Sequence, residues 1–364
     1  MGQPVKRGAK AAMAVLAFLA IAAAVAIGAV VYLQGADKPG DGERAASNLS
    51  FTAWIADWQW KEGIEDFRVI APRLDRVQLF GVYFDDRDRI HATEGLDAAV
   101  AAVREAAGPD GGNRVRVDLA IVNDIVHADG TTTQKVPALL SRWMASGERR
   151  GALIERIAEL AEAYRADGVE IDFERVRDED WERVILFFGE LHDRLRASGR
   201  QLRIVLEPRA PVEHFAWPEG PEYVMMAYNL YGPHSGPGPK ADDALIRRLA
   251  DRMDRLPGNR ALAIAAGGFD WSESGGAAAV TERQALELAR RSAGEGGVSR
   301  DEASGSLHFE YVDDDGARHT VWYADRNTLE RWIETARNAG ISRIAIWKLG
   351  GFERSTLDGL GGAA

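Results

Sequence analysis

Short apolar runs alternate with amphipathic segments along most of the chain after residue 49. The apolar runs are rich in β-branched and aromatic residues, which is typical of buried strands. Eight such runs cover 51–57, 76–84, 114–123, 168–174, 202–208, 223–231, 261–271 and 343–350. Between them apolar positions recur with helical spacing, for example over 96–108, 151–168, 180–199, 244–256 and 327–340.

This alternation predicts an α/β fold, a (β/α)8 TIM barrel that covers residues 49–357. A doubly wound open sheet fits the alternation nearly as well, but such a sheet usually has fewer strands than the eight runs found here. Another helix-like segment (281–292) and two alternating runs around Asp-Asp-Asp-Gly (307–323) break the rhythm. We therefore expect a small α+β insertion after strand seven, at about 275–324, with a hairpin in it.

The N-terminus has the pattern of a membrane anchor. Basic residues in 1–10 precede an uncharged apolar run over 11–33, which would span roughly 34 Å as a helix. This run predicts a transmembrane signal anchor with 1–10 in the cytoplasm and the barrel outside the cell membrane of a bacterium. A long cleaved signal peptide, which would release a secreted enzyme, is the alternative. Residues 34–48 predict a flexible linker, and 358–364 predict a disordered tail.

Charge and composition narrow the class of partner. The net charge of −11 argues against nucleic acid as a partner, and neutral glycans remain open. The chain has no cysteine, so it has neither disulfides nor a thiolate nucleophile. We expect no cofactor and no metal, and we expect a monomer.

The candidate chemistry is concentrated in the segment DGVEIDFE (167–174). In a strand Glu170, Asp172 and Glu174 share one face, and the opposite face is apolar. Three carboxyl groups at intervals of about 6–7 Å inside a barrel cannot all ionise freely, so at least one keeps its proton near neutral pH, as a general acid must. Glu174 lies nearest the C-terminal mouth, where barrel active sites are found. A solvated surface strand and a Mg²⁺ or Ca²⁺ site are the alternatives.

This segment resembles the D-G-x-D-x-D-x-E signature of glycoside hydrolase family 18, the chitinase family. Glu170 departs from the signature, because the family usually has Asp there. The run Met226-Ala227-Tyr228-Asn229 resembles the family's M-x-Y-[DN], and Trp347 stands where the family places the floor of its sugar pocket. The runs YNLYGPHSGPGP, VWYADRNTLERW and AIWKLGG are similar to the bacterial cell-wall and spore-cortex N-acetylglucosaminidase branch.

The resemblance implies hydrolysis of β-1,4-linked N-acetylglucosamine glycans, of peptidoglycan or chitin type, with retention and with assistance from the substrate. It implies that Glu174 is the acid, that Asp172 stabilises an oxazolinium intermediate and that Tyr228 orients the acetamido group. Strand ends and resemblance together give the predicted substrate-binding residues: Trp347, Glu170, Asn229, Trp58, Tyr231 and Glu207. The alternative function is a weak or inactive family member that acts as a carbohydrate-binding protein.

Overall fold

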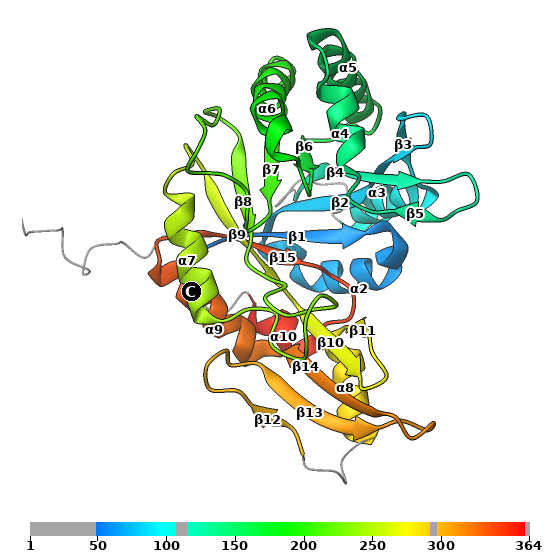
Figure 1. Cartoon of the computed structure of the whole chain (residues 1–364), viewed down its shortest axis with the longest axis vertical. Coiled ribbons are helices and arrows are strands. Elements are labelled where there is room, and N and C mark those ends of the chain that lie inside the picture. The colour runs from blue at the N-terminus through cyan, green and yellow to red at the C-terminus, as the bar shows by residue number, and fades with distance from the viewer. Residues whose placement is uncertain (1–48, 107–114, 292–296, 361–364) are drawn as a thin grey trace, which may run out of the picture. The chain divides into compact units, whose positions relative to one another are not determined.

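The computed structural model describes residues 49–106, 115–291 and 297–360, and these residues form a closed parallel barrel with a second sheet beside it (Figure 1). Each barrel strand pairs in parallel with its neighbours, and β2 closes the ring by pairing with both β1 and β4. The eight predicted strands are therefore confirmed: β1 Ser50–Ala56, β2 Leu74–Asp85, β4 Arg116–Val126, β6 Gly168–Asp172, β7 Gln201–Leu206, β8 Glu222–Met226, β9 Arg260–Ala265 and β15 Arg343–Trp347.

Helices cover the outside of this barrel. They are α2 Trp60–Ile70, α3 Glu94–Ala106, α4 Pro137–Met144, α5 Gly147–Ala163, α6 Trp181–Arg196, α7 Asp243–Met253, α9 Arg326–Asn338 and α10 Arg354–Gly359. Three of them begin at side chains that cap their free backbone N–H groups: Ser146, Asp242 and Asp325. Between β7 and β8, residues 207–221 form no helix, so the outer layer is interrupted there.

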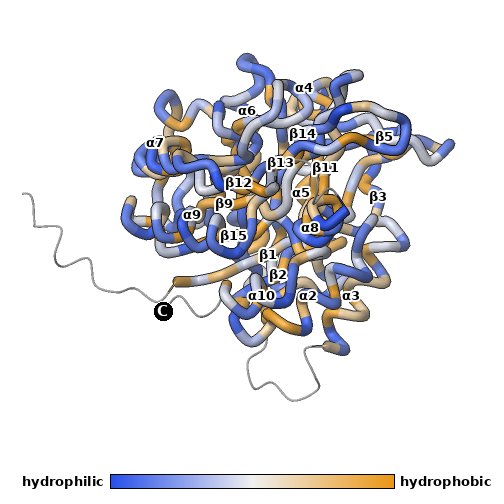
Figure 2. The backbone as a smooth tube through the Cα atoms, turned by 90° about the horizontal axis from the view of Figure 1, so that it is seen from below, coloured by the Kyte–Doolittle hydropathy of each residue, from blue (hydrophilic) through white to orange (hydrophobic). Residues whose placement is uncertain are grey.

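Two apolar layers hold the barrel together. The larger layer lies between the strands and the helices, and along helices such as α2 and α3 the hydropathy colour alternates, as expected of helices with one buried face (Figure 2). The smaller layer fills the barrel and combines alanines with a few large side chains, among them Trp54, Phe80 and Met226. Small side chains inside the barrel leave room for the polar groups that point inward from β6 and β7.

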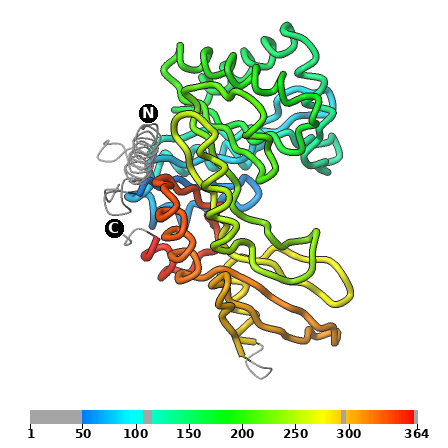
Figure 3. Tube along the Cα trace, turned by 60° about the vertical axis from the view of Figure 1, so that its left-hand side comes forward, coloured from blue at the N-terminus to red at the C-terminus, as the bar shows by residue number. Residues whose placement is uncertain are grey.

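The second sheet is antiparallel and extends away from α5 and α6 (Figures 1 and 3). It contains β10 Gly267–Ser272, β11 Ala277–Val280, β12 Ser299–Arg300, β13 Leu307–Val312 and β14 Arg318–Ala324, with α8 Glu282–Arg291 packed against it. The hairpin around Asp-Asp-Asp-Gly is present, since β13 pairs with β14 and the Asp313 carboxylate accepts bonds from two backbone N–H groups of the turn.

The insertion starts earlier than its predicted bound of about 275. The run 261–271 is two strands, because β9 ends in the barrel and Gly267, at φ 61°, turns the chain into β10 of the second sheet. A side chain at Gly268 would place its Cβ 1.7 Å from the carbonyl oxygen of Trp322, so only glycine allows this close strand pairing.

The two ends of the chain are only partly described. The predicted cytoplasmic flank (1–10), transmembrane anchor (11–33) and linker (34–48) lie outside the described residues. Within the described ranges, every helix is too short or too polar to cross a bilayer. The predicted disordered tail needs correction at its start, because α10 runs on to Gly359 and Leu360 is buried.

Two short strands, β3 Ile90–Ala92 and β5 Thr132–Thr133, extend the barrel sheet.

Candidate active site

Strand β6 carries acidic side chains into the barrel and apolar ones outward. Val169, Ile171 and Phe173 pack in the layer beneath the helices, whereas Glu170 and Asp172 are buried on the opposite face. The strand starts at a tight position, where a Cβ on Gly168 would lie 2.5 Å from Oδ1 of Asp118. The glycine of the motif, Gly168, is therefore required by packing.

Glu170 lies at the base of the site and is fully buried. Its carboxylate accepts hydrogen bonds from Nε1 of Trp54 (2.5 Å) and Nε of Arg203 (2.9 Å). Burial raises the pKa of Glu170 to about 7, and the Arg203 guanidinium opposes this rise. Glu170, which was predicted to contact the substrate, does not line the cavity: one of its oxygens is held by Trp54 of β1, across the barrel, and the other by Arg203 of the adjacent strand β7.

Asp172 lies one step higher and lines the cavity. Its Oδ1 is buried and has no hydrogen-bond partner among the described residues. Burial, together with the charges of Glu174 and Glu170, raises the pKa of Asp172 well above its usual range. Asp172 can therefore either keep a proton or, when ionised, interact with a cationic group or a hydrogen-bond donor of a ligand.

Glu174 follows β6 at the mouth, and its backbone is fixed from both sides by Asn123. The Asn123 amide donates to the carbonyl oxygen of Glu174 and accepts from its N–H, each at 2.9 Å. The carboxylate forms an ion pair with Nζ of Lys135. Burial raises the pKa of Glu174, and Lys135 lowers it. These contacts place a partly exposed carboxyl group, with a pKa above its ordinary value, at the barrel mouth.

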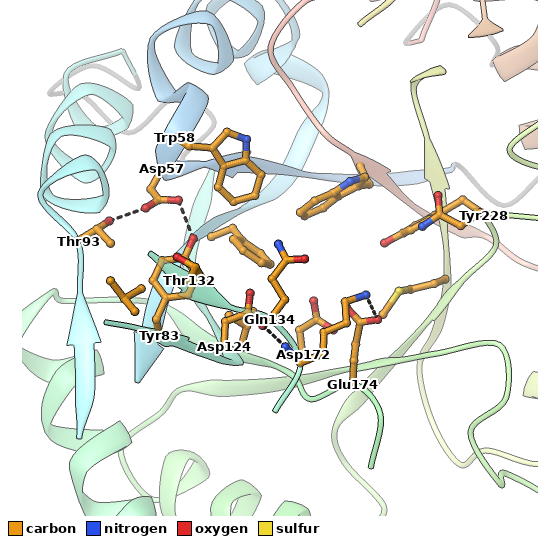
Figure 4. A pocket seen from close by; sticks show the side chains of 17 residues that line it. Asp57, Trp58, Tyr83, Thr93, Asp124, Thr132, Gln134, Asp172, Glu174 and Tyr228 are labelled. Carbon is orange, nitrogen blue, oxygen red and sulfur yellow. Dashed lines mark hydrogen bonds and ion pairs between the residues drawn. The ribbon is translucent and has the colours of Figure 1, made fainter. Parts of the chain in front are cut away.

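The side chains at the mouth enclose a cavity of about 460 Å³ (Figure 4). Asp172 and Glu174 lie on one side of it and Trp58 on the opposite side. The Trp347 ring stacks edge-on against Phe80, with centroids 5.3 Å apart, and 59% of Trp58 is exposed. A half-open cavity with carboxyl groups facing indole rings suits a sugar, whose hydroxyl groups need polar partners and whose C–H faces need apolar ones.

The structure brings six of the nine predicted residues to the cavity: Asp172, Glu174, Tyr228, Asn229, Trp58 and Trp347. Burial and the charge of Asp172 raise the pKa of Tyr228 well above its usual value, so its hydroxyl group stays a donor. Two of the predicted residues lie outside, in addition to Glu170. Glu207 accepts a bond from the N–H of Arg175 (2.6 Å), and the ring of Tyr231 packs over Gly238.

Sequence reasoning missed several polar residues of the cavity. Tyr83 and Thr93 each donate a hydrogen bond of 2.8 Å to the carboxylate of Asp57, which they hold at the rim. Asp124 accepts from the N–H of Lys135 (2.8 Å) and so fixes the loop that presents Lys135 to Glu174. Tyr83 stands at the end of a predicted strand (76–84) and Asp124 directly after another (114–123), a signal that could have found them. Lys135 lies in a loop after β5 with no recognisable motif.

Metal binding was the alternative for the carboxylate strand. Across 49–106, 115–291 and 297–360, no group of three or more His, Asp or Glu side chains is placed to hold a metal ion. The arrangement is instead suited to proton transfer, with one carboxyl group at the mouth and one buried beside a tyrosine hydroxyl.

Known proteins share this barrel. No protein-family model matches the chain. Its sequence is 27% identical over 247 residues to a putative sporulation-specific glycosylase, YdhD, of Bacillus subtilis, covering 64% of this chain and 57% of that protein. Two solved structures have the same fold. One is the Bacillus cereus spore cortex-lytic enzyme SleL, with a TM-score of 0.72 and 19% identity over 86% of this chain and 74% of that one. The other is a chitinase from Chromobacterium violaceum, with a TM-score of 0.71 and 18% identity over 86% of this chain and 99% of that one.

In its sequence and in its barrel, the chain resembles a class of proteins, the chitinase-like glycoside hydrolases. More particularly, the predicted resemblance to glycoside hydrolase family 18 is confirmed. The chain spans little more than half the length of the curated relative named above.

Proposed function

We propose that this chain hydrolyses β-1,4-linked N-acetylglucosamine glycans with retention, using the acetamido group of the substrate as nucleophile. The observation that carries the proposal is the column of Glu170, Asp172 and Glu174, which rises from a sealed base to the barrel mouth beside Tyr228. Only the upper two carboxyl groups reach the cavity, and the pKa of each is raised.

Glu174 donates its proton to the glycosidic oxygen as the bond to the anomeric carbon breaks. The acetamido oxygen of the same sugar attacks that carbon, and a cationic oxazolinium forms. Asp172, whose Oδ1 has no partner among the described residues, hydrogen-bonds the acetamido N–H and stabilises the cation. Tyr228 donates its hydroxyl proton to the acetamido group and holds it in line. Water then opens the oxazolinium, and Glu174, now a base, takes the proton.

Peptidoglycan is the proposed glycan, and the chain is proposed to act outside the cytoplasm of a bacterium. Support for the glycan comes from the names of the relatives, a sporulation-specific glycosylase and a spore cortex-lytic enzyme. Support for the location comes from the basic residues and the apolar run at 11–33, which we propose as a membrane anchor. We also propose that the chain is a monomer; light scattering tests this.

The test is turnover of a fluorogenic di-N-acetylchitobioside and of purified peptidoglycan by the wild-type chain and by Glu174→Gln. Release that disappears in the variant supports the proposal. If the chain binds glycan but releases no product from either substrate, it is instead a carbohydrate-binding protein. This is the alternative suggested by Glu170, which stands where the family usually has Asp.

A further inference from the structure

A second cavity, of about 450 Å³, adjoins the first at the junction between the barrel and the second sheet. The two cavities share Trp58 and Trp347 in their walls. The second is bounded on its other side by β10, β11 and the start of α8. Its volume falls in the range of small-molecule pockets, roughly 300–1,000 Å³. A glycan that occupies the first cavity thus has room for a neighbouring sugar or a substituent in the second.

Two lysines, Lys240 and Lys348, line this second cavity and make it cationic. Lys240 comes from the long loop after β8, and its Nζ donates to the carbonyl oxygen of Ala266 (2.9 Å) and lies 4.9 Å from the centre of the Phe269 ring. Lys348 follows β15, and its Nζ donates to the Gln59 side chain.

Among the described residues, the polar partners of the two lysines are a carbonyl oxygen and an amide oxygen and not a carboxylate, although the whole chain carries a net charge of −11. Burial lowers the pKa of both, that of Lys240 to about 8, and the charge of Lys348 lowers the pKa of Lys240 further. Two ammonium groups that repel each other are therefore held in one cavity, at a cost that an anion would offset.

Three carboxyl groups lie near this cavity: Glu62 and Asp66, whose charges raise the pKa of Lys348 and so oppose the effect of burial, and Glu282. Glu282 accepts from the hydroxyl of Thr356 (2.6 Å) and the N–H of Glu353 (3.0 Å). Asp66 accepts from the N–H groups of Gly350 (2.7 Å) and Phe352 (3.2 Å). Glu282 and Asp66 thereby fix the loop after β15, and Lys240 and Lys348 line the cavity.

We infer that this second cavity binds a carboxylate carried by the glycan, next to the sugar that is cleaved, through Lys240 and Lys348. The inference rests on the proposed function and narrows its substrate to glycans with acidic substituents. A lactyl ether on the sugar and the carboxylate of an attached peptide both supply this group. A neutral N-acetylglucosamine polymer would leave the two lysines without a counter-ion.

The test compares Lys240→Gln and Lys348→Gln with wild type in the full-length, detergent-solubilised chain. Four substrates are compared. Three have equal length: a neutral N-acetylglucosamine oligosaccharide, the same glycan with lactyl ethers on alternate sugars, and the methyl ester of this lactyl glycan. The fourth is a lactyl glycan that carries peptides. Each variant should raise KM about tenfold for the lactyl glycan, the loss expected for one charge-assisted hydrogen bond, and leave the neutral glycan and the ester within about twofold. An effect seen only with the peptide-bearing glycan would assign the carboxylate to the peptide.

Lys61→Gln is the matched control, because Lys61 is exposed and lines neither cavity. Equal KM changes on neutral and acidic glycans would overturn the inference. If wild type turned over none of the substrates, the proposed function would be contradicted instead. Calorimetric binding of the lactyl glycan and of its ester to wild type and to the variants would then test the inference independently of turnover.

Discussion

The ammonium group of Lys135 is paired with the carboxylate of Glu174, the residue proposed to donate the proton. This pair favours the ionised form of Glu174, whereas burial favours the protonated form, and burial is the larger effect. The pKa of the proposed acid is thus set by two opposing features. One of them is a single lysine whose position depends on Asp124.

Removal of this lysine should move the pH profile upward. In Lys135→Gln the pKa of Glu174 rises, so the protonated acid persists to higher pH and the alkaline limb of kcat/KM shifts to higher pH. The measurement is kcat/KM on the chitobioside from pH 4 to 9. Lys61→Gln should leave the limb in place, and a shift to lower pH would contradict the assignment of Glu174 as the acid.

Replacement of the proposed acid should strongly lower turnover and spare binding. Glu174→Gln keeps the shape and the backbone contacts with Asn123 but has no proton to give, so kcat should fall by about 10²–10⁴-fold. Glu190→Gln is the control, because Glu190 of α6 is also a half-buried carboxylate paired with a cation, Arg150, but does not line the cavity. Steady-state kinetics and glycan calorimetry check both parts, and a variant that still turns over within tenfold of wild type would exclude this role.

Two tyrosines near the same loop provide a matched pair. Tyr228 lines the cavity, whereas Tyr231 lies outside it. Tyr228→Phe should lower kcat by about 10²-fold, because the acetamido group loses its orienting donor, with a smaller change in KM. Tyr231→Phe should leave both constants unchanged. Similar effects of the two changes would place the reaction elsewhere.

Glu170 should matter for the stability of the barrel. Glu170→Ala leaves Arg203 buried without one of its carboxylate partners and should lower the free energy of unfolding by about 3–5 kcal/mol. Urea unfolding followed by tryptophan fluorescence measures this. A loss below about 1 kcal/mol would mean that Glu222 alone satisfies Arg203.

Stability should fall as the pH rises toward neutrality. Burial raises the pKa of Glu282 to about 7 in the folded chain, above an ordinary value near 4.3, so folding favours its protonated form. Its contribution is complete below the unfolded pKa, declines as the pH rises and is lost above pH 7. In Glu282→Gln the decline in unfolding free energy between pH 5 and 7 should be shallower than in wild type. An unchanged slope would show that Glu282 does not titrate in this range.

Much of the barrel could be predicted because its strands are buried on both faces and read as continuous apolar runs. The period of two on β6 also predicted that Glu170 and Asp172 face inward. What holds Glu170 could not be predicted, since Trp54 comes from β1, far away in the sequence, and the inward-pointing Arg203 of β7 belongs to no recognisable motif. The pairing of Lys135 with Glu174 depends on a loop conformation with φ 54° at Lys135, which no hydrophobic pattern encodes.

The most direct test of the central claim is the dependence of cleavage on the acetamido group. The wild-type chain is given an N-acetylglucosamine tetrasaccharide and its fully deacetylated counterpart, and the anomer formed first is followed by proton NMR. The account predicts that only the acetylated glycan is cleaved, with the β-anomer appearing first. Cleavage of the deacetylated glycan at a comparable rate, or first appearance of the α-anomer, would contradict substrate-assisted retention.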